Sequence, residues 1–147
     1  MKISKPKIIL DTNIVLVSIL PHHKYHWVYQ QFLKKEYILY ISNEILNEYY
    51  EKLLEKFGLN IANSTLDLII VSPNIEKIEP SFRFLLIKDD PDDDKFVDCA
   101  IAGNVDFIVT HDKHFNVLKD IPFPKVETLK IDEFKDILDN WTKEAFE

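Results

Sequence analysis

The chain has 147 residues, 46% of them hydrophobic and 29% charged, which is the composition of one ordinary water-soluble globular domain. Its two glycines exclude glycine-rich phosphate loops and the dinucleotide-binding fingerprint, and its single cysteine, Cys99, excludes an intrachain disulfide and a cysteine-rich zinc site. No apolar run reaches the roughly 18 residues of a transmembrane helix, and the first residues, MKISKPKIILDTN, meet an aspartate too early for a signal peptide. We therefore expect a cytoplasmic protein.

The net charge of −7 is concentrated in two segments. Residues 89–98 (DDPDDDKFVD) carry −5 and residues 131–147 carry −4, which leaves +2 on the other 120 residues. No domain-wide excess of lysine and arginine is available to neutralise many phosphates, so an extended basic nucleic-acid surface is excluded, although a local site is not. The acidic run at 89–98 requires either exposure to water or a bound cation.

Short apolar runs alternate with segments of helical period along the chain. In the first half of the chain the pattern predicts a strand at 7–10 (KIIL), a helical segment from Ile14 that breaks at Pro21, a helix at 25–33, a strand at 37–41, and helices at 43–57 and 60–71. In the second half it predicts a candidate strand at 84–87 (FLLI), a helix from Asp93 or Asp94 to Gly103, and a strand at 106–110. A short helix at 113–118, a strand at 125–129 and a helix at 132–141 follow. This alternation predicts an α/β fold whose mostly parallel sheet is covered on both faces, in one domain over residues 1–147.

Aspartates follow two of the predicted strands, at the edge where a parallel α/β sheet binds ligands. Asp11 comes directly after KIIL, and Asp112 comes two residues after DFIV. If these strands are neighbours, their ends lie about 5 Å apart and both side chains can reach one site. A third acid can come from Asp93 or Asp94, at the start of the helix that leads into DFIVT, and a fourth from Glu48, on the helix after the second strand.

Carboxylates gathered this closely repel one another, so one or more of them would be protonated unless a cation compensates the charge. Oxygen ligands of this kind select Mg²⁺ or Mn²⁺ over zinc or copper. A metal held by few carboxylates keeps bound waters and accepts phosphate oxygens, so its chemistry is the activation of a water for attack on a phosphodiester. The pattern therefore predicts a metal-dependent nuclease. A Mg²⁺-dependent phosphatase fits less well, because DTN is not the DxD motif that such enzymes commonly carry.

Four motifs in this order resemble the PIN domain family of ribonucleases, along essentially the whole chain, and in particular the toxins of toxin-antitoxin pairs. They are IILDTNI at 8–14, ISNEILNEYYEKL at 41–53, DPDDDKFVDCAIAG at 90–103 and DFIVTHDKHF at 106–115. The resemblance implies a three-layer α/β/α fold and a Mg²⁺- or Mn²⁺-dependent endoribonuclease acting on RNA. It also implies an antitoxin protein as partner, and a homodimer in many relatives.

The resemblance assigns the catalytic and metal-binding acids to Asp11, Glu48, Asp93 and Asp112. Three acids remain alternative or additional ligands: Asp94 in place of Asp93, Glu44 in place of Glu48, and Asp98 as a peripheral ligand. Helical spacing favours Asp93, because it shares a face with Val97 and Ala100, whereas Asp94 shares its face with Asp98. Asn13 and Thr110 are expected to orient Asp11 and Asp112 by hydrogen bonds.

Simpler interpretations exist for each of these features. Asp11 could cap the helix that follows it, and Glu48 belongs to a stripe of glutamates that would ordinarily be a solvated helix face. The residues Lys95, His111, Lys113 and His114 either contact the RNA backbone or balance local negative charge. A PIN-like module that binds RNA or a protein without cleaving anything is the alternative function.

Overall fold

The computed structural model describes residues 4–144, with side chains through Trp141, and is built on a five-stranded parallel sheet of order β3-β2-β1-β4-β5. The β1 and β4 strands are central neighbours, as the site prediction requires. The strands are β1 (Lys7–Leu10), β2 (Ile38–Ile41), β3 (Ile75–Lys77), β4 (Phe107–Val109) and β5 (Thr128–Leu129).

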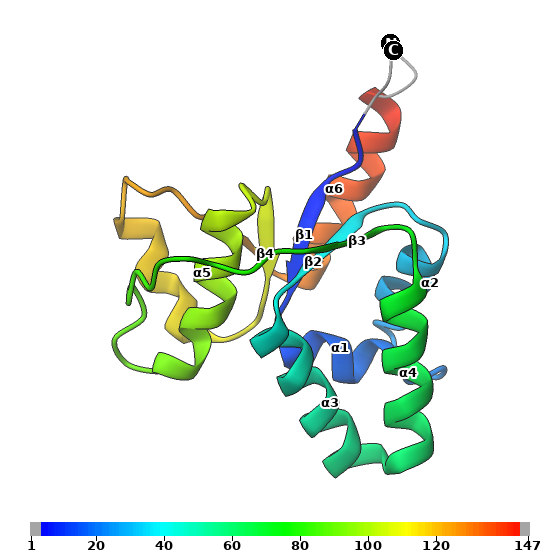
Figure 1. Cartoon of the computed structure of the whole chain (residues 1–147). Coiled ribbons are helices and arrows are strands. Elements are labelled where there is room, and N and C mark those ends of the chain that lie inside the picture. The colour runs from blue at the N-terminus through cyan, green and yellow to red at the C-terminus, as the bar shows by residue number, and fades with distance from the viewer. Residues whose placement is uncertain (1–3, 145–147) are drawn as a thin grey trace.

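Helices lie on both sides of the strands, with α5 on one side and α2 and α4 on the other (Figure 1). This confirms the predicted three-layer α/β/α fold. None of the described helices is both long and apolar enough to cross a membrane. The helices are α1 (Thr12–Ser18), α2 (Trp27–Leu33), α3 (Asn43–Phe57), α4 (Leu59–Val71), α5 (Asp94–Ala102) and α6 (Ile131–Glu144), with 3₁₀ segments η1 (Pro91–Asp93) and η2 (Lys113–Asp120).

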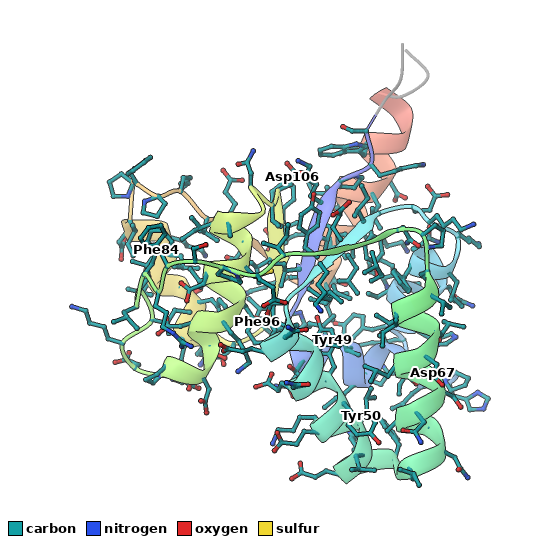
Figure 2. The ribbon with its side chains drawn as sticks, viewed as in Figure 1. Tyr49, Tyr50, Asp67, Phe84, Phe96 and Asp106 are labelled. Atoms are coloured by element: carbon teal, nitrogen blue, oxygen red, sulfur yellow. The ribbon has the colours of Figure 1, made fainter. Side chains whose placement is uncertain are left out.

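The continuous apolar runs form the buried centre of the sheet. Ile8 and Ile9 of β1 point to opposite faces and are both fully buried, as expected for a strand covered by helices on each side. Tyr49 of α3 and Phe96 of α5 are also fully buried, and both lie near the strand ends (Figure 2). The hydroxyl of Tyr49 donates a hydrogen bond to the carbonyl of Leu10, which ties α3 to the end of β1.

The prediction of a strand at 84–87 is wrong, and the strand that precedes α5 is β3 instead. The amide of Phe84 donates to the Asp98 carboxylate at 3.0 Å, and the amide of Ile87 donates to Asp94 at 2.9 Å. Carboxylates of α5 therefore accept the hydrogen bonds from these backbone amides that a neighbouring strand would accept in a sheet. The segment runs over α5 as an extended loop and brings the chain to η1.

Candidate metal centre

The carboxyl ends of β1 and β4 bring Asp11 and Asp112 to one edge of the sheet. Leu10 is in register with Val109, and the amide of Asp11 donates to the Val109 carbonyl at 3.0 Å. Thr110 Oγ1 donates to Asp11 Oδ2 at 2.8 Å and accepts from the Asp112 amide at 3.0 Å. One threonine hydroxyl thus fixes the side chain of one acid and the backbone of the other. Asp11 also precedes α1 at the capping position, but its side chain makes no capping hydrogen bond.

The 3₁₀ turn η1 delivers Asp93 to the same edge. One ligand atom from each of Asp90, Asp93, Asp112 and His114 lies within 4.8 Å of the others. His114 Nδ1 is 3.3 Å from Asp112 Oδ1 and 3.7 Å from Asp93 Oδ2. The His114 amide donates to Asp112 Oδ1 at 2.9 Å, which holds this carboxylate at the start of η2.

Burial and the repulsion between carboxylates dominate the electrostatics of the cluster. Asp93 Oδ2 is buried and makes no hydrogen bond to any described residue. Burial, together with the negative charges of Asp112, Asp90 and Asp11, raises the pKa of Asp93 to about 8. Burial also raises the pKa of Asp11, against the hydrogen bonds from Thr110 and the Thr12 amide, and the charges of Asp112 and Glu48 raise it further. A divalent cation would supply a partner for the orphaned oxygen and relieve the repulsion, so these residues fit a metal held by oxygen ligands.

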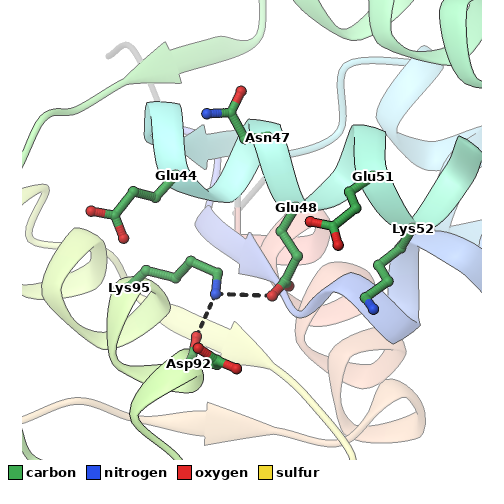
Figure 3. A pocket seen from close by; sticks show the side chains of 7 residues that line it. All are labelled: Glu44, Asn47, Glu48, Glu51, Lys52, Asp92 and Lys95. Carbon is green, nitrogen blue, oxygen red and sulfur yellow. Dashed lines mark hydrogen bonds and ion pairs between the residues drawn. The ribbon is translucent and has the colours of Figure 1, made fainter.

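Glu48 lies on α3, whose start is fixed by Ser42 accepting a hydrogen bond from the Ile45 amide. The Thr12 hydroxyl donates to the Glu48 carboxylate, and the charge of Glu48 acts on Asp11. Lys95 Nζ lies 2.9 Å from Glu48 Oε1 and also donates to the backbone carbonyl of Asp92, as Figure 3 shows. Glu48 is therefore beside the centre but already neutralised by a lysine.

A hollow of about 350 Å³ opens on the Glu48 side of the cluster, and we call it the α3 cavity. The acids that line it carry four negative charges against two lysines. Its lining residues, drawn in Figure 3, are Glu44, Asn47, Glu48, Glu51, Lys52, Asp92 and Lys95.

The three alternative acids are engaged elsewhere. Asp94 and Asp98 accept the amides of the 84–87 loop, as described above. Glu44 forms an ion pair with Arg83 at 3.1 Å. Asp93 thus belongs to the Asp90–His114 cluster and Asp94 does not, and the charge of Glu48 acts on Asp11 whereas Glu44 pairs with Arg83.

The remaining candidates differ in their surroundings. Asn13 is exposed on the first turn of α1, whereas Thr110 makes the two hydrogen bonds on which the strand ends depend. Among the expected RNA contacts, Lys95 is paired with Glu48, and His111 Nε2 accepts from the Ile131 amide at 3.1 Å. Lys113 is exposed beside Asp112.

Sequence reasoning did not single out Asp90, and it gave His114 only as an RNA contact. Asp90 Oδ1 accepts from the Asp92 amide at 3.1 Å and begins η1, with Pro91 at the first position of the turn. The Asp-Pro pair is the signal that could have indicated a capped turn. Nothing in the sequence could have indicated that His114 folds back onto the acid two residues before it.

Comparison with known proteins identifies the family and the fold. The family model of the PIN domain matches residues 7–114. The solved structure of VapBC2 from Rickettsia felis, bound to a DNA fragment from their promoter, matches with 22% identity and a TM-score of 0.58, over 84% of this chain and 97% of that chain. The sarcin-ricin loop cleaving toxin VapC20 of Mycobacterium tuberculosis matches with 15% identity and a TM-score of 0.55, over 82% of this chain and 98% of that chain. At these identities the two structures show a shared fold. The comparison with curated proteins finds no match.

Proposed function

This chain belongs to the PIN domain family, and on that premise we propose that it is a Mg²⁺- or Mn²⁺-dependent endoribonuclease and the toxin of a toxin-antitoxin pair, acting in the cytoplasm. The observation that carries the proposal is the gathering of Asp11, Asp93 and Asp112 at one sheet edge, where the buried Asp93 Oδ2 accepts no hydrogen bond from any described residue. Structural similarity to a toxin that cleaves the sarcin-ricin loop supports RNA as the substrate.

In this proposal Asp11, Asp93 and Asp112 hold the ion, and Glu48 binds the ion or its water. When bound, the ion supplies a water activated for attack on phosphorus and compensates the charge that develops on the phosphodiester. Thr110 orients Asp11 through its hydroxyl, and the His114 amide orients Asp112. Preorganised ligands of this kind keep the geometry of the site fixed while the substrate enters.

An antitoxin, or a second copy of the chain, would need an apolar surface on this protein. Two groups of exposed large side chains offer one: Phe82 and Leu85, on the loop over α5, and Ile70 and Val71, at the end of α4. The similarity to VapBC2 supports a protein partner of this kind.

The test is cleavage of RNA by the purified chain in Mg²⁺, in Mn²⁺ and in EDTA. We expect cleavage only with a divalent ion, and its loss in Asp11→Asn and Asp112→Asn, with a melting temperature equal to or above that of the wild type because repulsion is relieved. Asp120→Asn, an exposed acid at the end of η2, is the matched control and should cleave normally. Metal-dependent cleavage that persists in Asp11→Asn would refute the site, and RNA binding without cleavage in any metal would favour the non-catalytic module.

A further inference from the structure

A second hollow, of about 330 Å³, opens on the other side of the metal centre. It lies between the end of β4, η2, β5 and the start of α6, and we call it the η2 cavity. Asp112 is one of its lining residues, so the cavity begins at the candidate centre itself. The charged residues that line it are Asp112, Lys113, Lys119, Lys130 and Glu133.

The charge of the η2 cavity is opposite to that of the chain as a whole. Lys113, Lys119 and Lys130 are exposed, and none of their ammonium groups forms an ion pair with a carboxylate of the described residues. Glu133 accepts a hydrogen bond from the backbone amide of Lys130 at 2.9 Å, so its carboxylate caps the start of α6. The η2 cavity therefore holds three lysines without an ion pair in the described part of the chain, next to the candidate ligand Asp112. The chain as a whole has a net charge of −7.

The α3 cavity, on the Glu48 side, has the reverse character. Its two lysines already have acidic partners, since Lys95 pairs with Glu48 at 2.9 Å and Lys52 pairs with Glu55 at 3.4 Å. Of the other acids that line it, Glu44 pairs with Arg83 at 3.1 Å, whereas Glu51 and Asp92 form no ion pair within the described residues. A polyanion that reaches the centre meets repulsion on this side and unpaired ammonium groups on the other.

We propose that the η2 cavity is the RNA-binding subsite of this protein, where Lys119 and Lys130 hold backbone phosphates next to the phosphodiester at the centre. The inference rests on the proposed function and deepens it by giving the strand a path, from Asp112 along η2 and away from α3. Lysines bind phosphate as point charges and make no contact with the base. The subsite therefore positions the RNA strand without sequence specificity. A volume of about 330 Å³ falls within the usual range of ligand pockets.

An acidic protein segment would also be attracted to these lysines. RNA is favoured because the cavity shares Asp112 with the centre, so a strand whose phosphodiester lies at the centre has these lysines beside it. The carboxylates that line the α3 cavity repel the phosphates of an RNA strand.

The experiment measures binding of a short, labelled single-stranded RNA by fluorescence anisotropy in EDTA, at salt concentrations between about 50 and 300 mM. The variant is Lys119→Gln/Lys130→Gln, and the matched control is Lys52→Gln/Lys56→Gln, which removes two lysines near the α3 cavity. Loss of two phosphate contacts should weaken binding about tenfold or more at the lowest salt and reduce the slope of log K against log salt by about 1.4. The control should bind within twofold of the wild type, and Lys119→Arg/Lys130→Arg should restore binding.

Because the readout is binding without metal, it is independent of cleavage. A wild type that binds RNA through these lysines but does not cleave it would refute the proposed nuclease activity and support the subsite. An unchanged dissociation constant and salt slope in the Lys119→Gln/Lys130→Gln variant would overturn the subsite, even if the wild type cleaves. Lysine-dependent binding of poly-glutamate in place of RNA would overturn it as well, in favour of an acidic protein partner.

Discussion

The hydroxyl of Thr110 connects the two acids that end β1 and β4, donating to Asp11 Oδ2 at 2.8 Å while it accepts from the Asp112 amide at 3.0 Å. Thr110 is itself buried, and so is Asp11. A buried hydroxyl that donates and accepts in this way holds both groups in one geometry, and it partly offsets the unfavourable burial of the Asp11 charge. The oxygen of this one side chain therefore sets the relative position of two candidate metal ligands.

We expect Thr110→Val to lower RNA cleavage and Mn²⁺ affinity by about 10- to 100-fold, the usual effect of removing a group that orients a metal ligand. The valine keeps the volume and β-branched shape but neither donates nor accepts a hydrogen bond. Isothermal titration with Mn²⁺ and initial rates of RNA cleavage measure the two effects. Thr110→Ser, which retains the hydroxyl, should stay near wild type.

Thr65→Val is the matched control, because Thr65 is buried on α4, away from the strand ends. It should change neither Mn²⁺ affinity nor cleavage by more than twofold. If Thr110→Val behaves like this control, the hydrogen bonds of Thr110 do not organise the site.

The parts of the fold that carry the centre could be predicted because their local signals and their tertiary environments agree. KIIL and DFIV each contain a continuous apolar run of three residues, and these runs lie in β1 and β4, which helices cover on two faces. Ser42 and Gly58 bound α3 as capping preferences predict, which fixes Glu48 on a known helix. Helical faces favour Asp93 over Asp94 as the ligand, and that choice stays a prediction; in the structure Asp93 lies in the Asp90–His114 cluster and Asp94 accepts the Ile87 amide.

Other parts depend on contacts that the sequence does not reveal. The β3 strand has three residues at the edge of the sheet, and two of its side chains, Glu76 and Lys77, are exposed, so it lacks an apolar run. FLLI has such a run, but its first and last amides donate to Asp98 and Asp94. The pairing of Lys95 with Glu48 likewise joins α5 to α3 across a distance in sequence that no periodicity describes.

The raised pKa of Asp93 predicts a definite pH dependence of stability in the metal-free protein. The folded state keeps this proton until about pH 8, whereas the unfolded chain loses it near the ordinary value of 3.8. The folded state therefore binds more protons between about pH 4 and pH 8, and the free energy of unfolding falls as pH rises through that window. Burial shifts the pKa of Asp11 in the same direction.

Asp93→Asn removes this titration, so we expect a flatter stability profile and a higher melting temperature than wild type at pH 8 in EDTA. Each kcal/mol recovered corresponds to about 2–4 °C in a domain of this size. Thermal melts from pH 4 to pH 8 measure it, with Asp120→Asn expected to follow the wild-type curve. Saturating Mn²⁺ should raise the wild-type melting temperature most at pH 8, where protons compete least, and should not raise that of Asp93→Asn. A wild-type profile that rises between pH 4 and pH 8 in EDTA would contradict the prediction.

The ion pair between Lys95 and Glu48 gives the last prediction, because this ammonium group supplies positive charge beside a centre that otherwise collects carboxylates. Lys95→Met keeps the length of the side chain and removes its charge. We expect the metal-free protein to lose about 1 kcal/mol of stability, since Glu48 and Asp11 then repel each other without compensation. Mg²⁺ should bind about 3- to 10-fold more tightly, because the site becomes more negative by one charge.

Lys52→Met is the matched control for Lys95→Met, since Lys52 lines the same α3 cavity but pairs with Glu55 in an exposed pair three residues apart on α3. Such a pair contributes at most about 0.5 kcal/mol, so stability and Mg²⁺ affinity should both stay close to wild type. The RNA dissociation constant in EDTA distinguishes neutralisation of Glu48 by Lys95 from a direct contact of Lys95 with the RNA backbone. A lysine that neutralises Glu48 leaves RNA binding within twofold when it is removed, whereas a lysine that binds phosphate weakens it and leaves Mg²⁺ affinity unchanged.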